Sequence, residues 1–131
     1  MATVRTANAY WEGPLLSGAG KVSLDSSGLG TFDVTWAART EPPTDKTSPE
    51  ELIAAAHSTC FSMAFAHALA QAGTPPDRLD TRADVTFQPG EGITGSHITV
   101  RGRVPGMSEA DFVAAAEAAK VGCPVSKALT G

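Results

Sequence analysis

The first third of the chain alternates between apolar and polar residues, the pattern of half-buried β-strands. The apolar positions that share a strand face are Val22 and Leu24 in one segment, and Phe32, Val34 and Trp36 in the next. Residues 26–28 between these segments are typical of a turn, and Tyr10 and Trp11 indicate an earlier strand. The pattern therefore predicts an N-terminal antiparallel β-meander, followed by a polar, Pro-bearing loop at residues 40–47.

A long helix is predicted after that loop. Ser48 is a suitable N-cap, Pro49 suits the first helical position, and Glu51 completes a capping box. Gly73 predicts the end of the helix at about residues 71–72. Because the segment carries almost no charge after Glu51, we expect a buried central helix, in the domain centre or across a subunit interface.

The second half of the chain predicts a further β-hairpin and two C-terminal helices. The alternating segments are residues 82–87 and 97–104, separated by the Gly-rich residues 89–92. One helix is predicted after Ser108 and ends at Gly122, and a short helix begins near Pro124. This order of elements predicts an α+β fold in a single domain spanning residues 1–131.

Composition and charge narrow the class of protein. The 131 residues are 42% apolar and 18% charged, with a formal net charge of −4 and no basic stripe, which argues against nucleic-acid binding. We find no apolar signal segment at the N-terminus and no apolar run of membrane-spanning length, so no membrane partner is predicted. The predicted location is the cytoplasm, where a cysteine pair is more often catalytic or redox-sensing than structural.

The only two cysteines are Cys60 and Cys123, and their spacing to histidine does not fit a zinc site. Cys123 precedes Pro124 at a predicted helix start, where the helix dipole favours a thiolate, so from position alone it is the more acidic thiol. Cys60 lies within an apolar helix, where a free cysteine is often only a small buried hydrophobic residue. The polar neighbours of Cys60, including His57, weaken that interpretation and favour a redox pair.

Two motifs around these cysteines carry a family resemblance. Residues 48–63, SPEELIAAAHSTCFSM, and residues 122–127, GCPVSK, resemble the two signature segments of the OsmC/Ohr family of osmotically inducible and organic-hydroperoxide-resistance proteins. Residues 10–13, 36–41 and 104–106 are more similar to the OsmC branch. The resemblance implies an intertwined α+β homodimer with active sites at the subunit interface. It also implies a thiol-dependent peroxidase for stress defence that reduces organic hydroperoxides, with hydrogen peroxide as a further candidate substrate.

The resemblance also implies roles for individual residues. Cys60 matches the peroxidatic cysteine and Cys123 the resolving cysteine, which reverses the order of reactivity expected from helix position alone. Arg39 matches the activating arginine, and Glu50 matches a glutamate that orients it. No bound cofactor or metal is implied: the substrate is a hydrophobic peroxide, and an external dithiol or lipoylated protein restores the thiols.

Helix geometry adds a constraint on Glu50. Glu50 and Cys60 are ten residues apart in the predicted helix, which separates them by about 15 Å along its axis. A glutamate side chain does not cover that distance, so a Glu50 that serves Cys60 belongs to another chain, which predicts at least a dimer.

Two other functions remain open from the sequence. One is a non-catalytic redox sensor that oxidises the same cysteine pair once. The other is a small domain that binds apolar ligands and holds both cysteines as inert core residues.

Overall fold

The computed structural model of the chain describes residues 2–42 and 45–130. These residues form two compact units, divided between Leu52 and Ile53. The prediction of a single domain over residues 1–131 stays a prediction.

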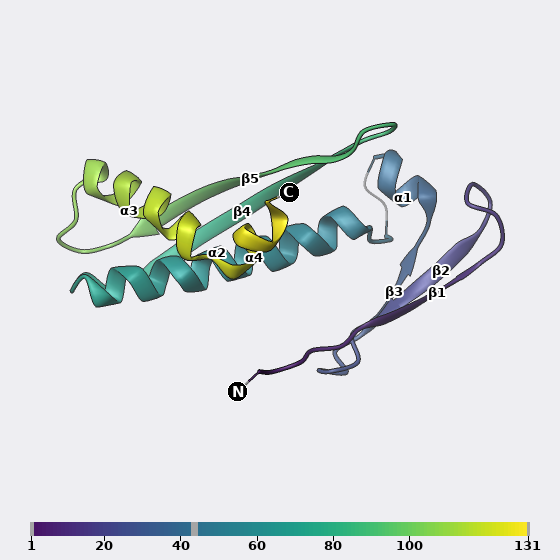
Figure 1. Cartoon of the computed structure of the whole chain (residues 1–131), viewed down its shortest axis with the longest axis horizontal. Coiled ribbons are helices and arrows are strands. Elements are labelled where there is room, and N and C mark those ends of the chain that lie inside the picture. Colours follow the sequence, from purple (N-terminus) through teal and green to yellow (C-terminus); the bar gives the residue numbers. More distant parts are fainter. Residues whose placement is uncertain (1, 43–44, 131) are drawn as a thin grey trace. The chain divides into compact units, whose positions relative to one another are not determined.

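The first unit contains the predicted antiparallel meander (Figure 1). Its strands are β1 (Asn8–Glu12), β2 (Ala19–Ser23) and β3 (Thr31–Val34), hydrogen-bonded in that order. A short helix, α1 (Trp36–Thr40), follows β3 and was not predicted from the sequence.

Two predicted strand positions are wrong. Leu24 lies beyond the end of β2, where its N–H donates to the carbonyl of Gly30 within the turn. Trp36 begins α1 instead of continuing β3. The pairing of β3 with β2 ends at Val34, and the hydroxyl of Thr35 accepts the Ala38 N–H at 3.1 Å, which caps the helix.

The predicted loop at residues 40–47 is described only in part, because residues 43–44 lie outside the described residues. Thr40 instead closes α1, and Thr47 forms a parallel bridge with Val34. After the loop, the long helix α2 (Pro49–Gln71) starts as predicted, with the Glu51 N–H donating to the Ser48 hydroxyl at 3.2 Å.

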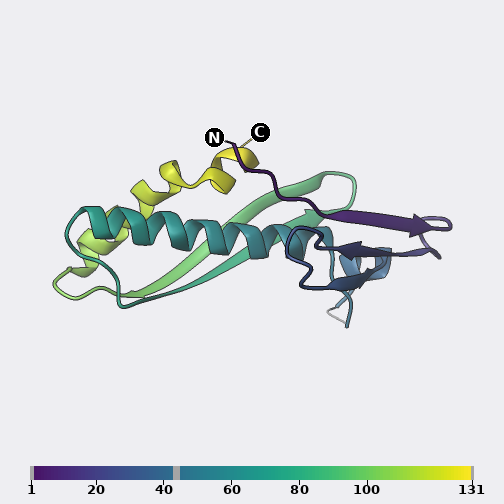
Figure 2. The same cartoon turned by 90° about the horizontal axis from the view of Figure 1, so that it is seen from below.

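The second unit is built on a β-hairpin of β4 (Arg78–Gln88) and β5 (Gly92–Arg103). Figures 1 and 2 show residues 53–71 of α2 running alongside this hairpin. The unit is completed by α3 (Glu109–Gly122) and α4 (Pro124–Leu129), which confirms the predicted hairpin and the two C-terminal helices. Ser108 caps α3 as expected, accepting the Asp111 N–H at 3.2 Å.

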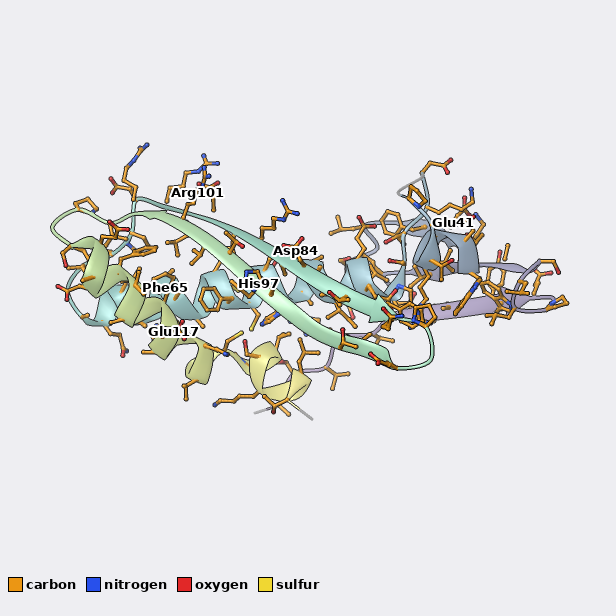
Figure 3. The ribbon with its side chains drawn as sticks, turned by 90° about the horizontal axis from the view of Figure 1, so that it is seen from above. Glu41, Phe65, Asp84, His97, Arg101 and Glu117 are labelled. Atoms are coloured by element: carbon orange, nitrogen blue, oxygen red, sulfur yellow. The ribbon has the colours of Figure 1, made fainter. Side chains whose placement is uncertain are left out.

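Alternation along the hairpin gives it one half-buried face and one exposed face. In β4 every second side chain is half-buried and its neighbours are exposed. Figure 3 shows Asp84 and Arg101 projecting from the hairpin away from the helices. The half-buried face, including Leu79, Ile98 and Val100, packs against the core.

The core of the second unit lies between this face, α2 and α3. Phe65 is fully buried, and its ring lies 5.7 Å from that of Phe61 and 5.2 Å from that of Phe112 on α3. The buried members of the core cluster are Phe61, Phe65, Leu69, Ala119 and Cys123. Cys123 is therefore part of the packed core at the point where α3 ends and α4 begins.

No apolar run of membrane-spanning length was expected from the sequence, and the length and composition of α2 correct that prediction. By these two criteria alone, α2 is long and apolar enough to cross a membrane. Central helices of water-soluble cores meet the same criteria, and α2 packs Phe61, Phe65 and Leu69 into the core of the second unit. The composition of α2 therefore decides nothing about a membrane.

Candidate functional site: a thiol pair and a separate ion pair

The structure brings Cys60 and Cys123 together within the second unit. Both are free thiols; Cys60 is half-buried and Cys123 is 0% exposed. Cys60 lies in the middle of α2, and Cys123 is the residue that joins α3 to α4. Each thiol is close enough to affect the pKa of the other, so the pair is placed to interconvert between dithiol and disulfide.

The surroundings give the two thiols different acidities. Burial raises the pKa of Cys60, the backbone N–H of Val125 opposes that effect, and the neighbouring Cys123 adds to it. Burial also disfavours the thiolate of Cys123. Hydrogen bonds from the hydroxyl and N–H of Ser126, together with smaller contributions from Cys60 and Val125, outweigh burial and leave the pKa of Cys123 lowered.

Cys123 has this environment because it is the N-cap of α4. Its Sγ accepts the N–H of Ser126 at 3.5 Å, in the way that serine or aspartate oxygens accept at other helix starts. Pro124 occupies the first helical position, where its missing N–H costs nothing. The greater acidity predicted for Cys123 from its position in the sequence therefore has its counterpart in the structure.

Arg39 and Glu50 form an ion pair in the first unit. Arg39 Nε lies 3.2 and 3.0 Å from the two carboxylate oxygens of Glu50, and an Nη lies 2.9 Å from Oε2. Glu50 is 7% exposed, and the guanidinium of Arg39 also lies 5.7 Å from the ring centre of Trp36. The pair fixes the direction of the guanidinium, which is the geometry expected of an oriented positive charge.

Glu51, next to Glu50, stabilises the start of α2. Its carboxylate accepts the hydroxyl of Thr47 at 2.6 Å, while its N–H bonds the cap residue Ser48. The four predicted site residues thus fall into two sets, the thiol pair in the second unit and the ion pair in the first. Their catalytic roles stay predictions.

His57 belongs to the surroundings of the thiol pair. It lies one helical turn before Cys60 on α2, is 6% exposed, and is hydrogen-bonded at both ring nitrogens. Nδ1 lies 2.6 Å from the hydroxyl of Ser96 on β5, and Nε2 lies 2.8 Å from the hydroxyl of Ser126 on α4. Burial lowers the pKa of His57.

The serine partners of His57 were missed at the level of sequence. Ser126 carries a local signal, because it stands three residues after the N-cap, where the N–H turns back toward the capping side chain. Ser96 carries no such signal, since its place beside His57 depends on how β5 packs against α2.

A groove of about 520 Å³ borders this cluster in the second unit. Its walls are largely apolar and come from α2, β5, α3 and α4, with Phe61, Ile98 and Phe112 among them. Phe61, the residue after Cys60 on α2, lines this groove. Phe65 is sealed in the core, and Met63 is 68% exposed. No group of three or more His, Cys, Asp or Glu within residues 2–42 and 45–130 is placed to hold a metal ion.

Comparison with known proteins places these features in one family. Residues 42–131 match the family described as OsmC-like protein. The chain is 39% identical over 132 residues to Peroxiredoxin OsmC of Escherichia coli strain K12, covering 98% of this chain and 92% of that protein.

Solved structures share the fold. An organic hydroperoxide resistance protein from Elizabethkingia anophelis superposes with a TM-score of 0.70 at 26% identity, covering 100% of this chain and 92% of the other. An OsmC-like protein from Mycoplasma pneumoniae, at 12% identity, superposes with a TM-score of 0.73, covering 100% of this chain and 90% of the other. The second match supports the fold alone.

Proposed function

This chain belongs to the OsmC family, and from that premise we propose that it is a thiol-dependent peroxidase that reduces hydroperoxides through Cys60 and Cys123. The observation that carries the proposal is the pairing of the two thiols in the second unit, one accessible and one buried. The peroxidase activity named for the relative at 39% identity supports the same conclusion.

In the first step, the Cys60 thiolate attacks the O–O bond of the peroxide. A sulfur–oxygen bond forms, the O–O bond breaks, and the alkoxide takes up a proton and leaves as an alcohol. Cys60 is the attacking residue because a peroxide reaches a half-buried sulfur, whereas Cys123 is completely enclosed. The apolar groove beside Phe61 favours a hydrophobic hydroperoxide.

In the second step, Cys123 attacks the sulfur of the Cys60 sulfenic acid. A disulfide forms, the sulfur–oxygen bond breaks, and water leaves. The lowered pKa of Cys123 suits it to this step, because the resolving thiol must give up its proton to attack the sulfenic acid. An external dithiol, free or on a lipoylated protein, then restores both thiols in the cytoplasm.

Among the residues that the structure describes, no cation of the second unit lowers the pKa of Cys60, so its activation requires a positive charge from elsewhere. Burial raises the pKa of Cys60, so an arginine is needed to favour the thiolate and to polarise the peroxide. We assign this role to Arg39, held in direction by Glu50.

Arg39 and Glu50 act on the Cys60 of a second chain. Glu50 and Cys60 are ten residues apart on α2, which is about 15 Å along the helix axis. The first unit also lacks a core of its own. Each hydrophobic residue that is fully buried among residues 2–42 and 45–130 belongs to the second unit, while Tyr10, Trp11 and Phe32 are 50%, 40% and 42% exposed. A homodimer supplies the Arg39 cation to the Cys60 of the other chain, and it covers the exposed aromatic residues of the meander.

Steady-state turnover of cumene hydroperoxide with dihydrolipoamide tests the chemistry. Wild type turns over repeatedly, Cys60→Ser does not react, and Cys123→Ser stalls after one equivalent as a sulfenic acid that dimedone traps. A wild type that oxidises only once points to the redox sensor instead. A wild type that does not react points to the ligand-binding domain, and an active Cys60→Ser refutes the assigned roles.

Mixed dimers test whether the site is shared between chains. Co-expressed Cys60→Ser and Arg39→Met chains, each inactive alone, form mixed dimers with one intact site. They recover about a quarter of wild-type activity if pairing is random. The absence of recovery, with mixed dimers shown by native mass spectrometry, places Arg39 and Cys60 of one chain in the same site.

A further inference from the structure

We propose that His57 accepts the proton of Cys123, through the Ser126 hydroxyl, when the disulfide closes. The proposal rests on the proposed function, and it makes His57 a positioning residue for the resolving step. It concerns only residues of the second unit, all of which the structure describes.

The first support is a continuous chain of hydrogen-bonding groups. Ser126 connects both ends: its hydroxyl lies 2.8 Å from Nε2 of His57 and also lowers the pKa of Cys123, whose Sγ accepts the Ser126 N–H at 3.5 Å. The far side of the ring, Nδ1, lies 2.6 Å from the hydroxyl of Ser96. A serine hydroxyl donates one hydrogen and accepts others, so Ser126 can receive a proton from Cys123 while passing its own to His57.

The second support is the state of the histidine before the reaction. Burial lowers the pKa of His57, so its ring is neutral at neutral pH and one nitrogen is free to accept a proton. After transfer, both N–H groups of the imidazolium have an acceptor, the hydroxyls of Ser96 and Ser126. This arrangement holds the cation for the short time that the step requires.

The Cys123 S–H bond breaks, its proton goes to Ser126 Oγ, and the Ser126 proton goes to His57 Nε2. The Cys123 sulfur forms the disulfide with Cys60 as the sulfur–oxygen bond breaks, and the departing hydroxide takes a proton from solvent and leaves as water. His57 returns its proton to solvent through the groove that its ring borders.

Other titratable groups surround the same groove and bear on any pH profile. Cys60 lies one turn along α2, and Cys123 lies at the start of α4. Besides His57, the titratable groups that line the groove are His97 on β5, and Glu117 and Lys120 on α3. His97 provides a matched control, since it is an exposed histidine in the same groove.

The test isolates disulfide closure after one equivalent of cumene hydroperoxide, by rapid acid quench and mass spectrometry across pH 5 to 9. In His57→Gln and Ser126→Ala we expect closure, measured relative to each variant's own rate of Cys60 oxidation, to be slowed about 10- to 100-fold near pH 7. The wild-type closure rate reaches its plateau below neutral pH, whereas the variants keep rising with pH. His97→Gln follows wild type.

A second measurement does not depend on peroxide. In a Cys60→Ser background, thiolate absorbance at 240 nm reports the ionisation of Cys123. We expect Ser126→Ala and His57→Gln to raise its midpoint by about one pH unit. Ser126→Ala also decides the question if His57→Gln does not fold, because the Ser126 N–H that caps Cys123 is retained.

The outcomes distinguish failure of the His57 relay from failure of the proposed peroxidase function. Unchanged closure rates and pH profiles in both variants overturn the role of His57 and leave the peroxidase intact. Equal slowing at every pH, with no change in profile, also overturns it, since that result reflects packing alone. A wild type whose Cys60 resists peroxide refutes the proposed function, and the relay in catalysis is refuted with it.

Discussion

The two units of this chain differ in what each supplies and what each lacks. The second unit has a packed core and both sulfur atoms, but it leaves Cys60 with a raised pKa. The first unit has an oriented guanidinium, but its meander has exposed aromatic residues on β1 and β3. The difference shows that the packed core and the oriented cation belong to different units, so under the proposed function neither unit is sufficient for a reactive thiol.

The largest expected effect concerns the unequal cores. Phe65→Ala removes a fully buried ring that packs against Phe61 and Phe112, and we expect it to lower the free energy of unfolding by about 3–5 kcal/mol. The matched control, Phe32→Ala, removes a 42% exposed ring from the first unit and costs about 1 kcal/mol or less within one chain.

Urea denaturation at two protein concentrations measures both changes. A cost for Phe32→Ala that depends on protein concentration shows that a second chain covers the meander. A cost equal to that of Phe65→Ala at every concentration would show a core within the first unit and remove the contrast.

The next effect concerns the charge that the first unit supplies. We expect Arg39→Met to slow Cys60 oxidation by about 10²- to 10³-fold, because the thiolate and the developing charge on the peroxide lose their cation. Glu50→Gln should cost less, since the guanidinium remains but is no longer held by a carboxylate. Stopped-flow rates with cumene hydroperoxide measure both.

Arg82→Met is the control for this experiment. Arg82 forms a comparable ion pair with Asp84, but it lies on the exposed face of β4 with 76% of its side chain accessible. A loss in Arg82→Met as large as that in Arg39→Met would mean that overall charge, and not the oriented pair, controls the reaction.

The smallest expected effect is on thiol acidity. Titration of Cys123→Ser by absorbance at 240 nm reports Cys60, whose midpoint we expect to rise by about one to two pH units on adding Arg39→Met. The midpoint of Cys123, measured in Cys60→Ser, should lie below its ordinary value and ignore Arg39, because Ser126 sets it. Equal responses of both thiols to Arg39→Met would contradict the division between the units.

Local sequence signals predicted most of the fold. The caps at Ser48 and Ser108 were predictable because each hydroxyl accepts the N–H of the residue three positions later in the chain. Trp36 was misassigned because its spacing continues the alternation of β3, while the cap at Thr35 and the end of pairing with β2 terminate the strand. An alternating pattern of apolar and polar residues carries no information about where the neighbouring strand ends.

The candidate site was predictable to the same extent. The acidity of Cys123 follows from its position at the start of α4, a local feature of the sequence. The bonds from His57 to Ser96 and Ser126 join residues 39 and 69 positions apart, so they depend on tertiary packing. No periodicity or motif in the sequence carries that information.

Under the proposed function, the complete burial of Cys123 determines which half of the oxidised pair a reductant meets. In the Cys60–Cys123 disulfide, an incoming thiolate reaches only the sulfur of Cys60, because Cys123 is enclosed by the core. The mixed disulfide therefore forms on Cys60, and Cys123 departs as the leaving group. Its lowered pKa speeds that departure, so the burial that hides Cys123 from peroxide also gives the recycling step its regiochemistry.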